Sequence, residues 1–179
     1  NLLAAAVWSP DAPRTANDFA RLKPERQGVW HEWAVAQELF RRAAIRAAYP
    51  DAGRRAAVRR RFRLEAGADN AGTVRASNII ILAVKPQQFP DVVAHLAPHL
   101  RRGQLVVSIA AGITLRWLEA RLPGLPVVRV MPSLPATIGC GFEAMAAGRR
   151  ATAAHRRIVR AIFESVGDVV ALPERHFNA

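Results

Sequence analysis

The stretch Asn78-Ile-Ile-Ile-Leu-Ala-Val-Lys-Pro-Gln87 decides the fold. Its apolar residues run without a break from Ile79 to Val84, whereas a strand with one face in water would alternate. The run therefore predicts a strand buried on both faces, as in the middle of a parallel sheet. Lys85 is charged and Pro86 lacks a backbone N–H, so we expect the strand to end at Val84. Open α/β sheets bind ligands at that carboxyl edge, although an ordinary strand with a polar loop would have the same pattern.

Two further strands follow the first, and a helix precedes each of them. Residues 88–100 and a helix capped by Thr114 carry apolar residues at helical spacing, and residues 104–109 and 126–131 form the apolar strands. Strands and helices that alternate over short connections require right-handed crossovers and a parallel sheet. The strand ends then meet at one edge, which predicts a site made of Lys85-Pro86, Ala110-Ala111-Gly112 and Pro132-Ser133.

Shorter elements are expected on both sides of these strands. Before them we expect a strand at 43–49, a helix at 51–62 with Asp51 as its N-cap, an extended piece at 64–68 and a helical turn at 72–77. After them we expect a strand at 142–147, a helix at 152–166 that Gly167 ends, and a strand at 169–172. In the last helix the residues expected to face inward are Ile158, Val159, Ile162 and Phe163.

The composition is that of a globular chain without a nucleic-acid partner. The chain has 179 residues, 51% of them hydrophobic, which is enough for one well-buried domain. The net charge of +12 comes almost entirely from Arg, since Lys occurs only at positions 23 and 85. The densest basic cluster, residues 54–63, lies on one expected helix without the aromatic residues that stack on bases. We therefore interpret the cluster as a solvated helix face.

Neither a metal site nor a membrane partner is expected. The single cysteine, Cys140, excludes an internal disulfide and fits a cytoplasmic location. With one Cys and scattered His residues, a structural zinc site is not expected. No apolar run approaches the roughly 18–20 residues that cross a bilayer.

Four motifs in order and in register carry a family resemblance. They are Ile-Leu-Ala-Val-Lys-Pro-Gln (81–87), Val-Val-Ser-Ile-Ala-Ala-Gly-Ile-Thr-Leu (106–115), Val-Val-Arg-Val-Met-Pro (127–132) and Ser-Val-Gly-Asp-Val-Val (165–170). From residue 43 onward the chain resembles the amino-terminal dinucleotide-binding domain of pyrroline-5-carboxylate reductase. The resemblance implies a Rossmann-like α/β fold, with a mostly parallel sheet and helices on both faces. It also implies NAD(P)H-dependent reduction of 1-pyrroline-5-carboxylate to L-proline, the last step of proline biosynthesis.

The resemblance assigns cofactor-binding roles to eight residues and a catalytic role to none. Asn70 matches an asparagine on the adenosine side of the cofactor. The loop after the family's fourth strand is matched by Ala83, Val84, Lys85 and Pro86. The small-residue loop beside the nicotinamide is matched by Ile109, Ala110 and Ala111. Tyr49 stands where NAD-specific proteins often carry an acid, and with Arg54 and Arg55 close by this favours NADP.

The sequence also departs from the family. A G-x-G-x-M-G turn would open the family's fold, but Gly28 is the only glycine before Gly53. Residues 132–135 are Pro-Ser-Leu-Pro in place of the family's usual Pro-Asn-Thr-Pro. We expect residues 1–42 to be an atypical segment, either native to the fold or produced by a reading-frame slip. Residues 43–179 are then a dinucleotide-binding domain, incomplete at its N-terminus and truncated before the family's dimerisation domain.

This fragment is expected to be inactive alone and to form homo-oligomers only with the missing domain. Two alternatives remain. One is an NADP-dependent dehydrogenase acting on a prephenate-like or hydroxy-acid substrate, against which the Val-Ser-Ile-Ala-Ala-Gly stretch argues. The other is a non-catalytic basic module that binds nucleic acid or nothing, which salt-dependent DNA binding with no response to NADPH would support.

Overall fold

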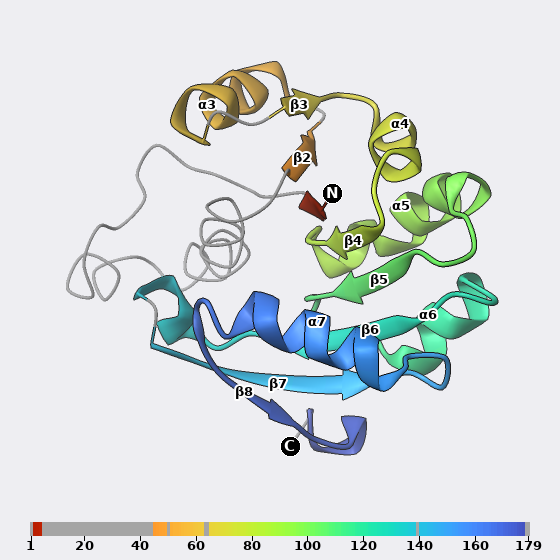
Figure 1. Ribbon diagram of the computed structural model, residues 1–179. Helices are drawn as coiled ribbons and strands as arrows, with labels where there is room; N and C mark the ends of the chain where they lie inside the picture. Colours follow the sequence, from red (N-terminus) through yellow and green to blue (C-terminus); the bar gives the residue numbers. More distant parts are fainter. Residues whose placement is uncertain (1, 5–44, 50, 63–64, 139, 178–179) are drawn as a thin grey trace.

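The computed structural model describes residues 2–4, 45–49, 51–62, 65–138 and 140–177, which form one eight-stranded sheet (Figure 1). In Figure 1 the strands run down the view from β3 to β8. In sheet order they are β3 (Glu65–Gly67), β2 (Ile45–Ala48), β1 (Leu2–Ala4), β4 (Ile79–Leu82), β5 (Leu105–Ser108), β6 (Val127–Met131), β7 (Gly141–Ala147) and β8 (Gly167–Ala171).

The strands from β3 to β6 are all parallel, as the sequence predicted. The order 3-2-1-4-5-6 is that of the doubly wound nucleotide-binding folds. β7 runs antiparallel to β6 and β8 runs parallel to β7, a reversal that the sequence did not predict. Only the turn with the 3₁₀ helix η3 (Leu134–Ile138) joins β6 to β7, and a parallel pair would need a crossover of about a dozen residues or more.

Helices cover both faces of this sheet. One face carries α4 (Asn70–Arg75), α5 (Phe89–Leu96) and α6 (Leu115–Arg121), and the other carries α3 (Ala52–Phe62) and α7 (Ala153–Phe163), which crosses in front of β6 in Figure 1. Successive residues of β4 alternate between these layers, since Ile80 packs on the α5 and α6 side and Ile81 on the α7 side. Both are buried, so the prediction of a strand covered on two faces is confirmed.

β1 is the element that the sequence did not predict. Leu2–Ala4 pairs in parallel with β2 and with β4, and so lies in the interior of the sheet. Three apolar residues are too few to show any periodicity, which is why this strand was missed. Residues 5–44, where most of the expected atypical segment falls, lie outside the described residues, and the division at residue 42 stays a prediction.

Several element boundaries differ from the predicted ones. β4 ends at Leu82 rather than Val84, and the amide of Ile109 donates to the Leu82 carbonyl at 3.3 Å where the ladder stops. The expected helix at 88–100 is α5 flanked by two 3₁₀ turns, η1 (Pro86–Gln88) and η2 (Ala97–His99). The N-cap role of Asp51 is confirmed, because its Oδ1 accepts from the Arg54 amide at 2.7 Å.

Two predictions about α7 and its end are wrong. Ile158 was expected to face inward but is 41% exposed. The helix ends at Phe163, and Gly167 begins β8 instead of ending the helix. A Cβ added to Gly167 would lie 2.1 Å from the Gly141 carbonyl oxygen, so this glycine allows β7 and β8 to approach each other.

Among the described helices, none is both long and apolar enough to cross a membrane.

Candidate functional site

The ends of β4, β5 and β6 lie side by side. Leu82 pairs with Ser108, and Ser108 pairs with Arg129, so the residues that follow them emerge at the same edge of the sheet. We call this edge the carboxyl rim and define it by residues 83–86, 109–112 and 132–133. The prediction that three strand ends converge is therefore confirmed.

The loop after β4 presents one charge and a fixed backbone. Ala83 is buried, so only its backbone can contribute to a ligand site. Val84 and Pro86 are partly buried, whereas Lys85 is exposed. The Lys85 carbonyl accepts from the Gln88 amide at 2.9 Å, which starts the turn η1 and fixes the direction of the loop.

The loop after β5 is built from small residues that leave its outer side open. Ile109 and Ala110 are buried, and Ala111 and Gly112 are exposed. Gly112 has a φ of +75°, a left-handed conformation that side chains with a Cβ rarely adopt. A Cβ added to Gly112 would meet nothing within 4 Å, so the loop leaves room for a flat group to approach.

Asn70 lies apart from the other seven predicted residues. It is the first residue of α4, which follows β3, and β2 and β1 stand between β3 and β4. The neighbouring Asp69 has its pKa lowered by the backbone amide of Gly72. The predicted set thus falls into two groups on opposite sides of β1, as an extended dinucleotide would require.

The end of β2 is on the same side of β1 as Asn70. Tyr49 follows β2 and is buried, and Arg55 donates from Nη1 to the Tyr49 carbonyl at 2.7 Å. Arg59 donates to the Ala66 carbonyl in the same manner. Two arginines of the expected solvated face thus fasten α3 to the sheet, while Arg54 is exposed near the end of β2.

Glu143 is a residue of this region that the sequence analysis missed. It is completely buried in β7, and its Oε2 accepts from the Ser133 amide at 3.0 Å. Its Oε1 has no hydrogen-bond partner among the residues described. Burial raises the pKa of Glu143 to about 7, and the bond from the Ser133 amide opposes that rise. An acid inside an otherwise apolar strand was the signal that could have identified it.

A second missed group fixes the helix after the β5 loop. Arg129 is completely buried in β6, and its Nη1 lies 2.9 Å from Glu174 Oε1. The same oxygen accepts from the Leu115 amide, the first of α6, at 2.7 Å. The Arg129 guanidinium also lies 5.0 Å from the centre of the Phe177 ring. Because the two ionic partners are 45 residues apart in sequence, no local pattern could predict the pair.

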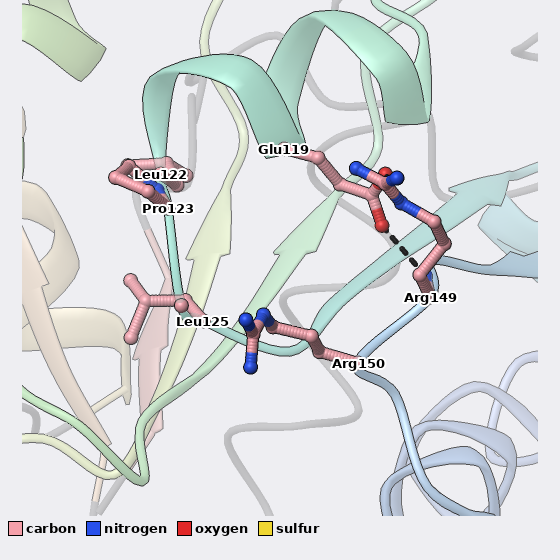
Figure 2. A pocket seen from close by; sticks show the side chains of 7 residues that line it. Glu119, Leu122, Pro123, Leu125, Arg149 and Arg150 are labelled. Carbon is pink, nitrogen blue, oxygen red and sulfur yellow. Dashed lines mark hydrogen bonds and ion pairs between the residues drawn. The ribbon is translucent and has the colours of Figure 1, made fainter.

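Two adjoining hollows lie around Glu119 and Arg149. Figure 2 shows one of about 380 Å³, where Arg149 folds onto Glu119 and Arg150 extends toward Leu125. Glu119 accepts from the Arg149 amide at 2.6 Å and from its Nε at 3.1 Å. The adjoining hollow, of about 570 Å³, shares Glu119 and Arg149. None of the eight predicted cofactor residues lines either hollow. Within the described ranges, no three His, Cys, Asp or Glu side chains are grouped to hold a metal ion.

Removing the carboxylate of Glu174 should destabilise the protein far more than removing that of Glu164. Glu174→Ala leaves the buried Arg129 without its ionic partner, which we expect to lower the free energy of unfolding by about 3–5 kcal/mol. Glu164 forms an exposed pair with Arg160 at 3.6 Å, so Glu164→Ala should change it by about 0.5 kcal/mol or less. Urea unfolding of the two variants measures the difference, and equal losses would contradict the role given to Glu174.

Glu143 should make the protein less stable as the pH rises toward 7. Its folded-state pKa of about 7 lies above the ordinary value of 4.5, so the protonated carboxyl favours the folded state. This contribution is complete below pH 4.5 and is lost as the pH rises to about 7, by about 3 kcal/mol in total. Glu143→Gln should remove that slope from the free energy of unfolding measured between pH 5 and 8. An unchanged slope would show that another group causes it.

Several known proteins are similar in sequence to this chain. Residues 32–112 match the family described as NADP oxidoreductase coenzyme F420-dependent. The chain is 33% identical over 145 residues to a pyrroline-5-carboxylate reductase of Synechocystis, covering 81% of this chain and 54% of that protein. It is 43% identical over 112 residues to one of Methanosarcina acetivorans, covering 62% and 42%. The chain thus spans about half the length of these relatives.

A solved structure shows that the fold is shared as well. The pyrroline carboxylate reductase of Plasmodium falciparum, determined with NADP bound, superposes with a TM-score of 0.70 at 23% identity, over 81% of this chain and 55% of that one. At this identity the structural likeness shows the fold alone, and the sequence relatives supply the family. The chain is therefore a relative of the pyrroline-5-carboxylate reductases, oxidoreductases that it matches over about half of their length.

Proposed function

We propose that this chain is the NADP-binding domain of a pyrroline-5-carboxylate reductase, which reduces 1-pyrroline-5-carboxylate to L-proline in proline biosynthesis. The observation that carries the proposal is the carboxyl rim. There the two loops that the family resemblance assigns to the cofactor, 83–86 and 109–111, follow strands that pair in register. The Val-Ser-Ile-Ala-Ala-Gly stretch (107–112) on this rim favours this family over a prephenate or hydroxy-acid dehydrogenase.

Two loops of the rim, together with Asn70 and Arg54, have roles in this proposal. NADPH, when bound, supplies the hydride. The exposed ammonium of Lys85 neutralises part of the charge of a phosphate. The small-residue loop 109–112 lies against the nicotinamide, whose flat ring the open side of Gly112 admits. Asn70 contacts the adenosine side, and Arg54 attracts the 2′-phosphate that distinguishes NADP from NAD.

The proposal extends to the setting of the protein. Its substrate is a small molecule, held by a further part of the enzyme that also provides the dimer contacts. It needs no nucleic-acid or membrane partner, and we place it in the cytoplasm, in keeping with its single cysteine.

A thermal shift assay tests cofactor binding. At a ligand concentration near 100 times Kd, NADPH should raise the Tm by about 5–10 °C, because ligand bound only to the folded state stabilises it. NADH should raise it less. Lys85→Gln should weaken NADPH binding by about threefold to tenfold through the loss of one phosphate contact. Arg102→Gln removes an exposed charge from the turn before β5, at the other edge, and should bind like the wild type. No shift with millimolar NADPH or NADH would overturn the proposal.

A further inference from the structure

Glu143 is buried in a way that a structural role alone does not explain. Its side chain is fully enclosed, one carboxyl oxygen has a single backbone donor, and Oε1 has no hydrogen-bond partner among the described residues. A buried carboxyl group without full hydrogen bonding is costly, and an apolar residue of similar size would be more stable there. Such groups are found mainly at functional sites.

The position of Glu143 connects it to the carboxyl rim. In the antiparallel register of β6 and β7, Met131 is opposite Ala144, so Glu143 lies beside the residues that follow β6. Its Oε2 accepts from the Ser133 amide at 3.0 Å, and the Ser133 hydroxyl accepts from the Phe142 amide at 2.7 Å. These two bonds fix the turn after β6 to β7. The carboxyl group therefore lies directly beneath the third loop of the rim.

The charged and titratable side chains of the neighbouring elements are exposed, hydrogen-bonded elsewhere or on the opposite face of the sheet. Arg156 and Arg157 of α7 and Cys140 before β7 are exposed, and His155 is hydrogen-bonded to Thr152. Arg160 of α7 donates to a backbone carbonyl of β8 at 2.5 Å and lies 3.6 Å from Glu164. Asp168 of β8 and Arg129 of β6 are paired with residues of β7 that point to the opposite face from Glu143. The turn η3 carries no titratable side chain. The charge of Glu143 is therefore directed at the rim without a neutralising partner from these elements.

We propose that Glu143 is a positioning residue of the cofactor site: it holds the Ser133 turn at the rim, and its carboxylate favours the oxidised nicotinamide over the reduced one. The inference rests on the proposed function. The two forms of the cofactor share every phosphate and differ in the ring, which is a cation when oxidised and neutral when reduced. A negative charge in a poorly solvated place nearby attracts only the cation. Ionisation of Glu143 thus promotes binding of the oxidised ring relative to the reduced ring.

The test is the ratio of two dissociation constants, Kd for NADP⁺ divided by Kd for NADPH, measured by titration calorimetry from pH 5.5 to 8.5. Titration of the 2′-phosphate and any loosening of the fold affect both constants alike and cancel in the ratio. The wild-type ratio should fall as the pH rises through about 7. A fall of about sixfold to fifteenfold corresponds to opposite charges roughly 10–15 Å apart inside a protein.

Glu143→Gln keeps the size of the side chain and removes its charge, so its ratio should not change with pH. Glu119→Gln is the matched control, since Glu119 binds Arg149 near the start of β6 (Figure 2), whereas Glu143 lies beside the end of β6, so its loss should leave the wild-type fall intact. A flat wild-type ratio, or a Glu143→Gln ratio that still falls, would overturn the inference while leaving cofactor binding in place. If Glu143→Gln does not fold, the wild-type ratio decides alone. Absence of any binding would instead overturn the proposed function itself.

Discussion

The register that aligns β4, β5 and β6 is the constraint on which the rest of the structure depends. Leu82, Ser108 and Arg129 stand at paired positions, and alternate residues of each strand enter the two core layers. A slip of one residue would reverse every side chain between those layers, so burial on both faces fixes the register strongly. The loops after the strands inherit this alignment, which brings parts of the chain that are far apart in sequence to one rim.

Two acids, the buried Glu143 and the partly buried Glu174, then fasten the rim from opposite faces of the sheet. Glu143 holds the turn after β6 from the α7 side. Glu174, which follows β8, holds the first amide of α6 and the buried Arg129 on the other side. Apolar residues at these two positions would stabilise the fold more, because no charge would have to be removed from water. Local rules of stability are often broken at functional or strained sites, so the two acids agree with the cofactor-binding role that we propose for the rim.

The sequence predicted what local patterns determine and missed what depends on distant contacts. The buried run at 79–84 and the helical spacing in α5 and α6 predicted the parallel sheet and its converging loops. The reversal at β7 was missed because an apolar strand has no direction in sequence. Gly167 was assigned to a helix end, whereas its closeness to Gly141 depends on the pairing of two strands. The roles of Glu143 and Arg129 were missed because each depends on a partner outside its own strand.

Hydrogen–deuterium exchange with and without NADPH tests whether NADP binds at the carboxyl rim, as we propose. Amides of 83–86 and 109–112 should exchange more slowly when the cofactor is bound, because a ligand at the rim shields them from water and suppresses local opening. The peptides around Glu119 and Arg149, near the start of β6, should exchange as before. Slower exchange only in those distant peptides, with no change in 83–86 or 109–112, would show that NADPH does not bind at the rim.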